Sequence, residues 1–137
     1  MANAWYDLYV QAAMTGAANV DLSTGTLKAT LIDAADYSFS QAHDFFDDVP
    51  AGARVATTTL ASPTVTGKVL DADDALFTSV TGDQAEAIII WKDTGNEATS
   101  RLVLYLDTGI TGLPVSPSGG DILVTWDATG IAALGTP

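Results

Sequence analysis

The acidic run Asp71-Ala72-Asp73-Asp74 is a dense group of potential metal ligands. Calcium is the metal to weigh here, because it needs only oxygen ligands and because Asp71 and Asp73 stand two residues apart. The run lacks the central glycine and the distal glutamate of an EF-hand loop. We interpret it as a solvated turn between strands, with a calcium site as the alternative, and we expect no bound metal and no cofactor.

Nucleophilic chemistry has equally little support. His43 is the only histidine, and the chain has no cysteine and no G-x-S-x-G sequence, so a Ser-His-Asp triad would have to use His43. Placed beside Asp44, His43 fits a solvated or capping residue better than a ligand or a pH switch. No nucleotide-binding glycine motif occurs, and no pair of acids stands out for glycoside hydrolysis. We therefore expect no catalytic residues and a protein that is not an enzyme.

The bulk composition fits one globular domain spanning residues 1–137, because 47% of the residues are apolar. The formal net charge of −12 opposes contact with phosphate backbones, so we expect no direct binding of nucleic acid. It also suits a protein that must stay in solution until it meets a specific partner. No signal peptide and no apolar run of about 20 residues is visible, which predicts synthesis in the cytoplasm and no membrane contact.

Two apolar runs, Ala87–Trp91 and Leu102–Leu106, lie on either side of a polar loop. Runs of about five residues rich in β-branched and aromatic side chains predict strands. They do not alternate strictly, so we expect both faces of each strand to be covered, as in the central hairpin of a two-layer structure.

Further strands are expected on either side of this hairpin, at spacings near ten residues. The predicted ranges are 26–33, 54–60, 64–70, 75–80 and 121–126, the last closing the sheet with Ile122, Val124 and Trp126 on one face. A single helical turn is expected near 41–46. This spacing predicts a mainly β fold: an antiparallel β-sandwich or β-barrel of about seven strands.

The two ends of the chain differ from this pattern. Residues 1–20 form an aromatic N-terminal arm, and residues 4–14 carry apolar side chains at helical spacing, followed by Gly16 as a stop signal. Trp5, Tyr6 and Tyr9 either cover one end of the core or contact a partner, since Trp and Tyr dominate interface hot spots. Residues 128–137 are rich in alanine and glycine and form either a trailing tail or a final short strand.

Several strings in the chain resemble a family of small structural proteins encoded by tailed bacteriophages and prophages. They are V-P-A-G-A-R-V-A-T at 49–57, the stretch from L-D-A-D-D-A-L-F to I-W-K-D-T-G at 70–95, and G-L-P-V-S-P-S-G-G-D-I-L-V-T-W-D at 112–127. The resemblance covers about 27–127 and consists of turns and core strands. It implies a component of the virion and assigns no functional residue.

Within this setting we expect a capsid decoration, or cement, protein on the outer surface of a phage head. Its partners would be the major capsid protein or other virion proteins and further copies of itself, with a trimer favoured. Docking could involve a strand added at a sheet edge, and multiple contacts per oligomer would strengthen it. The alternatives are a tail, neck or baseplate component and, of another class, a displayed carbohydrate-binding or adhesion module.

Overall fold

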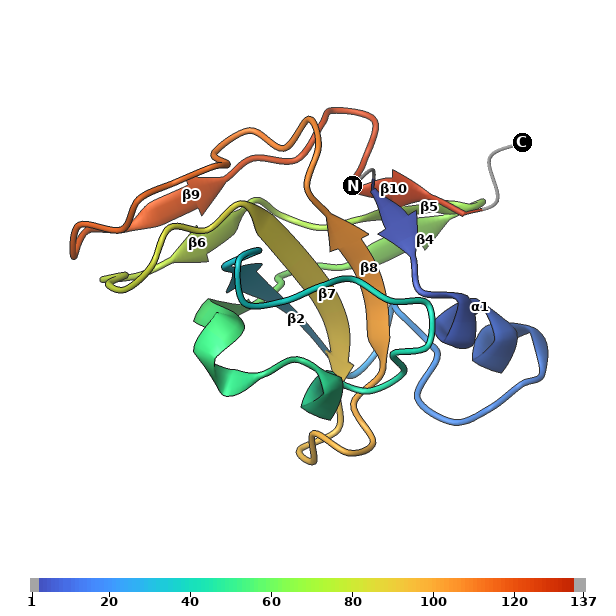
Figure 1. Ribbon diagram of the computed structural model, residues 1–137. Helices are drawn as coiled ribbons and strands as arrows, with labels where there is room; N and C mark the ends of the chain where they lie inside the picture. Colours follow the sequence, from blue (N-terminus) through green and yellow to red (C-terminus); the bar gives the residue numbers. More distant parts are fainter. Residues whose placement is uncertain (1–2, 135–137) are drawn as a thin grey trace.

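Strand β7 (Ala87–Asp93) occupies the middle of a five-stranded antiparallel sheet in the computed structural model, which describes residues 3–134 (Figure 1). It pairs with β2 (Thr26–Ile32) on one side and with β8 (Leu102–Leu106) on the other. All of β8 and all of β7 except Asp93 are buried, as expected for apolar runs covered on both faces. The predicted central hairpin is confirmed.

The five-stranded sheet ends in β3 (Arg54–Thr59) on one side and in β1 (Ala4–Trp5) on the other. The strands predicted at 26–33 and 54–60 are therefore confirmed to within a residue. The strand β1 was not predicted. Ala4 and Trp5 were expected at the start of a helix, but they lie opposite Tyr105 and Leu104 of β8.

A three-stranded sheet contains β4 (Thr64–Thr66), β5 (Val69–Asp71) and β10 (Ala132–Ala133). The single strand predicted at 64–70 is wrong, because Gly67 adopts a φ of 61° and begins a tight turn between β4 and β5. For the C-terminal segment the structure contains the short strand β10. Residues 135–137 of that segment lie outside the described residues.

Strands β6 (Ala75–Phe77) and β9 (Ile122–Val124) form a separate two-stranded ribbon, named the ribbon below. The expectation that β9 closes the main sheet is wrong, since its partner is β6. The side-chain pattern was predicted correctly: Ile122, Val124 and Trp126 are all buried. In Figure 1 the ribbon lies at the left of the molecule, far from α1.

Helix α1 (Asp7–Met14) is shorter than the predicted 4–14 because Tyr6 is still extended, with φ −73° and ψ 124°. Gly16 follows the helix with a φ of 70°, as its role as a stop signal predicts. The helical turn expected near 41–46 lies instead at Phe46–Asp48, as a 3₁₀ helix, and Ala51–Ala53 forms a second one.

The buried apolar side chains of the sheets, α1 and the 3₁₀ segments form one continuous core. The structure is mainly β, with antiparallel sheets packed together as in a sandwich and one short helix near the N-terminus, as predicted. It divides the β structure of the described residues into ten short strands where about seven were expected. None of the helices in the described range 3–134 has the length and apolar character needed to cross a bilayer.

Candidate functional site

Most of the N-terminal aromatic side chains pack in the core. Tyr6 is fully buried and Tyr9 is 5% exposed, whereas Trp5 is only half-buried. Tyr9 also donates its hydroxyl to the carbonyl oxygen of Val20 at 2.7 Å. Of the three residues predicted as a partner contact, the surface therefore offers Trp5, while Tyr6 and Tyr9 pack inside the chain itself.

The outer edge of β1 is closed by the side chain of Gln41. Its Nε2 donates to the carbonyl oxygen of Trp5 at 3.1 Å, and its Oε1 accepts from the backbone N–H of Asp7 at 2.7 Å. One amide thus satisfies a donor and an acceptor that an added strand would otherwise use. On the other side of β1, Asn3 Oδ1 accepts from the N–H groups of Asp107 and Thr108. Strand addition at this edge is therefore disfavoured.

His43 belongs to a chain of hydrogen bonds that reaches the core. The hydroxyls of Tyr6 and Tyr37 lie 2.8 Å apart, and the Tyr37 hydroxyl lies 2.8 Å from His43 Nδ1. His43 is half-buried, so the expectation of a solvated or capping residue is corrected. Burial raises the pKa of Tyr37 to about 12 and raises that of Tyr6 still further from its ordinary value. The chain joins the start of α1 to the loop that follows β2.

The neighbouring acids of this loop also hold backbone in place. Asp48 Oδ2 accepts from the N–H of Asp44 at 2.9 Å, and the carbonyl oxygen of Asp44 accepts from the N–H of Leu102. Burial raises the pKa of Asp44, and the nearby Asp48 carboxyl raises it further. These contacts fix the loop against β8 and explain why an acid pair stands beside His43.

The Asp71–Asp74 run acts as a turn that positions Trp126. Asp74 Oδ1 accepts from the backbone N–H of Trp126 at 3.1 Å, and the carbonyl oxygen of Asp73 accepts from its indole Nε1 at 3.1 Å. A different trio of acids, Asp33, Asp36 and Asp83, brings carboxylate oxygens within 4.8 Å of one another. The first of these already accepts from the N–H of Ala35, and the other two are exposed, so we assign no ion to this trio.

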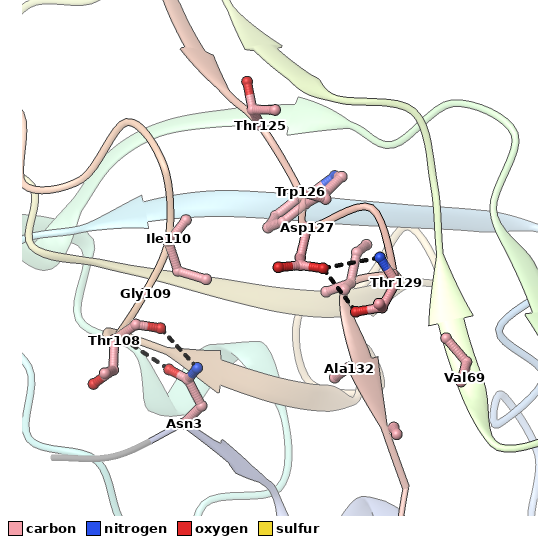
Figure 2. A pocket seen from close by; sticks show the side chains of 13 residues that line it. Asn3, Val69, Thr108, Gly109, Ile110, Thr125, Trp126, Asp127, Thr129 and Ala132 are labelled. Carbon is pink, nitrogen blue, oxygen red and sulfur yellow. Dashed lines mark hydrogen bonds between the residues drawn. The ribbon is translucent and has the colours of Figure 1, made fainter.

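A pocket of about 320 Å³ opens between the end of β8, the segment after β9 and β10 (Figure 2). Asp127 is its one acidic lining residue, and its Oδ1 accepts from both the N–H and the hydroxyl of Thr129. These bonds lower the pKa of Asp127. Asn3 lines the opposite wall and donates to the carbonyl oxygen of Thr108. A single carboxylate occupied by its own turn gives this pocket no acid–base pair.

Large aromatic surfaces for stacking on sugars are scarce. Trp91 is 5% exposed and stacks on Phe46, and Trp126 is 7% exposed with its indole bonded to Asp73. Trp5 is the tryptophan with the most open ring, and its Nε1 donates to the carbonyl oxygen of Ala133 at 3.1 Å. Within the described residues, the carbohydrate-binding alternative therefore has one partly exposed tryptophan, beside the partly exposed Phe39 and Phe45.

Four of the five lysine and arginine side chains form ion pairs or hydrogen bonds with other residues of the chain. Lys28 pairs with Asp93 at 3.0 Å, and the buried Lys92 donates to the carbonyl oxygens of Asp21 and Thr24. The other two such cations are Arg54, which pairs with Glu97 at 2.8 Å, and Arg101, which donates to the carbonyl oxygen of Ala18.

The remaining cation is Lys68, in the turn between β4 and β5. Its side chain is exposed and, within residues 3–134, has no hydrogen bond or ion pair. The body therefore presents an acidic surface with one unpaired lysine.

Four of the five large exposed apolar side chains in residues 3–134 lie in two places, and Met14 lies in neither. Leu76 and Leu123 are 47% and 52% exposed and lie directly opposite each other on the ribbon. Val65 and Leu134 are 48% and 36% exposed and line a groove of about 350 Å³ between α1 and the β4–β5 hairpin. We call this second surface the groove; its lining includes Trp5, Ala13, Val20, Val65, Leu134 and Lys68.

Sequence reasoning named Trp5 as a candidate and did not name the other members of these two surfaces. A signal was present for the ribbon: in A-L-F and I-L-V an apolar residue occupies the strand position whose side chain must face away from the buried one. No comparable signal marks the groove, because its members come from β1, α1, the loop after α1, the β4–β5 hairpin and Leu134, and only the fold brings them together.

The fold and these surfaces define a class: a small acidic, sandwich-like β protein with two exposed apolar surfaces. Neither a model of a known protein family nor a curated protein matches the chain.

Proposed function

We propose that this protein is a non-enzymatic structural component of a tailed-phage virion that decorates the outer surface of the head as a homo-oligomer, with a trimer favoured. The observation that carries the proposal is the distribution of exposed apolar side chains. Four of the five large exposed apolar side chains in residues 3–134 lie on the ribbon and in the groove, on an acidic body, while acids such as Asp74 and Asp127 accept hydrogen bonds that hold turns and backbone. Such a surface suits binding to a larger assembly better than it suits catalysis.

The charge of the body supports the same proposal. With a net charge of −12 and four of the five cations paired within the chain, free oligomers repel one another and do not aggregate before they reach the particle. Docking to a large assembly then gains strength from several contacts per oligomer, because the second and third contacts form at high effective concentration.

Copy number tests the proposal directly. Purified particles that carry the protein are separated on a stained gel, and the band is compared with that of the major capsid protein. We expect hundreds of copies per particle. A few to dozens of copies would contradict decoration and favour a tail, neck or baseplate component.

Deletion of the gene and add-back of the purified protein form the second test. We expect particles without the protein to assemble and to burst at a lower temperature than wild-type particles. Addition of the purified protein should restore the wild-type temperature. Particles that assemble with normal heat resistance but lack tails would contradict decoration. Binding of the isolated protein to a glycan array would favour the adhesion alternative.

A further inference from the structure

The ribbon carries an exposed apolar pair on its outer face and an acid at each end. Leu76 and Leu123 are cross-strand neighbours on its outer face, while the inner face is buried. Asp74 precedes β6 and Asp121 precedes β9, and both are exposed. Because the two strands are antiparallel, these carboxylates stand at opposite ends of the leucine pair. Their backbone contacts, to Trp126 and Ser79, hold them in place without neutralising them.

The groove is the concave counterpart on the same chain. Val65 and Leu134 leave large apolar surface open there, and the half-buried Trp5 forms part of the lining. Two charged residues line the groove beside this apolar surface: Lys68, the cation that has no partner within the described residues, and Asp21, whose carboxylate accepts from the N–H and the hydroxyl of Ser23. An apolar segment that carries a carboxylate fits this combination of shape and charge.

The distribution of exposed apolar side chains over the molecule also points to one occupant of the groove, a second copy of the chain. Among residues 3–134, five large apolar side chains are exposed: Met14, Val65, Leu76, Leu123 and Leu134. Two of them belong to the ribbon and two to the groove. In Figure 1 the ribbon lies at one end of the molecule, and α1 with the β4–β5 hairpin lies toward the other. The ribbon and the groove, on different parts of one chain, can meet only between copies.

We propose that the ribbon of one copy docks into the groove of the next, with Leu76 and Leu123 against Val65, Leu134 and Trp5, and with Lys68 facing a ribbon carboxylate. The contact is heterologous, so repetition gives a closed ring or an open chain, according to the rotation between copies. The inference rests on the homo-oligomer of the proposed function but not on the phage head, and the isolated protein tests it separately.

Two matched double variants each remove one half of the contact. Leu76→Thr with Leu123→Thr changes the ribbon, and Val65→Thr with Leu134→Thr changes the groove. All four positions are exposed, so the fold should be retained, which circular dichroism and the melting temperature verify. Met14→Thr is the control, since Met14 is 77% exposed and lies outside both surfaces.

Sedimentation equilibrium of the isolated full chain is the measurement. We expect wild type and Met14→Thr to self-associate, and each double variant to do so about 100-fold more weakly, because two large side chains no longer become buried. Lys68→Glu should weaken association by about 5-fold through charge reversal. A monomeric wild type, or an oligomer that both double variants retain, would overturn the proposal.

Mixing the two double variants separates this contact from a symmetric one. The ribbon variant keeps an intact groove, and the groove variant keeps an intact ribbon, so an equimolar mixture should form a one-to-one complex that neither variant forms alone. If the groove variant still dimerises by itself, the interface is formed by two ribbons and the proposal is wrong. If the protein were found in the phage tail, the decoration proposal would fail, but the expected sedimentation results for the variants and for their mixture would stay the same.

Discussion

Phe46 and Trp91 stack almost parallel, with ring centroids 3.8 Å apart and 7° between the ring planes. The guanidinium carbon of Arg54 lies 4.0 Å from the Phe46 centroid, on the face that Trp91 leaves free. Trp91 in turn donates its indole N–H to Thr30 Oγ1 at 2.9 Å. This column joins the 3₁₀ helix at Phe46–Asp48 to the middle of the main sheet, and it makes the long segment between β2 and β3 part of the core.

Replacement of Arg54 by lysine tests the column. Arg54 donates to the carbonyl oxygens of Phe46 and Val49 and makes two bonds to Glu97, a geometry that an ammonium group cannot reproduce. We expect Arg54→Lys to lower the free energy of unfolding by about 2 kcal/mol in urea titrations. Glu97→Gln is the control and should cost less than about 1 kcal/mol, because the Glu97 side chain is 53% exposed. Equal losses would show that the backbone contacts of Arg54 contribute nothing.

The hydrogen-bond chain through Tyr37 predicts an order of effects. Tyr37 contacts both Tyr6 and His43, so Tyr37→Phe breaks two bonds and leaves the fully buried Tyr6 hydroxyl without its partner. Tyr6→Phe breaks one bond and removes the buried hydroxyl itself. We expect costs of about 2 and about 1 kcal/mol, respectively, in the free energy of unfolding. A larger loss for Tyr6→Phe than for Tyr37→Phe would contradict this account of the network.

Alkaline titration tests the burial of the tyrosines. All four tyrosines have raised pKa values, chiefly because of burial, with those of Tyr9 and Tyr37 at about 12. The folded chain therefore holds protons that the unfolded chain, with pKa values near 10.0, has released. Stability is fully present below pH 10 and falls as the pH rises from 10 toward 12.

Tyrosinate absorbance and near-ultraviolet circular dichroism, recorded together, provide the measurement for that titration. We expect tyrosinate to appear only as the tertiary signal is lost, in one cooperative step. Ionisation of most tyrosines near pH 10 in a chain that is still folded would contradict the described burial. The unfolded chain in urea serves as the reference for free tyrosine.

Replacement of Gln41 tests the closed edge of β1. Gln41→Ala removes the acceptor of the Asp7 N–H and the donor to the Trp5 carbonyl oxygen. We expect amide exchange at Asp7 to become faster and stability to fall by about 1 kcal/mol, as measured by hydrogen exchange and urea unfolding. Gln11→Ala on the exposed side of α1 is the matched control and should change neither quantity. Unchanged exchange at Asp7 in Gln41→Ala would show that Gln41 does not protect the edge.

The parts of the fold that sequence predicted well are those determined by local pattern. The runs that became β7 and β8 are long, apolar and bounded by turn residues, and they could be placed to within two residues. Trp5 was misplaced because Trp5, Leu8 and Tyr9 share helical spacing, whereas pairing with β8 decided its conformation. The hairpin turn at Gly67 was missed because one glycine within a strand pattern does not distinguish a bulge or a close backbone approach from a turn.

The exposed apolar surfaces and the hydrogen-bond chain of His43 were harder to predict, since they depend on residues far apart in the chain. His43 meets Tyr37 and, through it, Tyr6, which no spacing rule connects. Leu76 and Leu123 are 47 positions apart in the numbering and become neighbours only through the pairing of β6 with β9. The prediction of Trp5 as a contact residue rested on residue type alone, and the groove supplies its surroundings.

Four of the five cations have partners within the chain, and this affects how copies would associate. Each copy directs a nearly one-signed field outward, so in dilute electrolyte two copies repel well before their apolar surfaces can meet. Counter-ions shorten the reach of that field, to about 8 Å at physiological ionic strength. We therefore expect added salt to promote the proposed self-association, although it should weaken the proposed contact of Lys68 with a ribbon carboxylate.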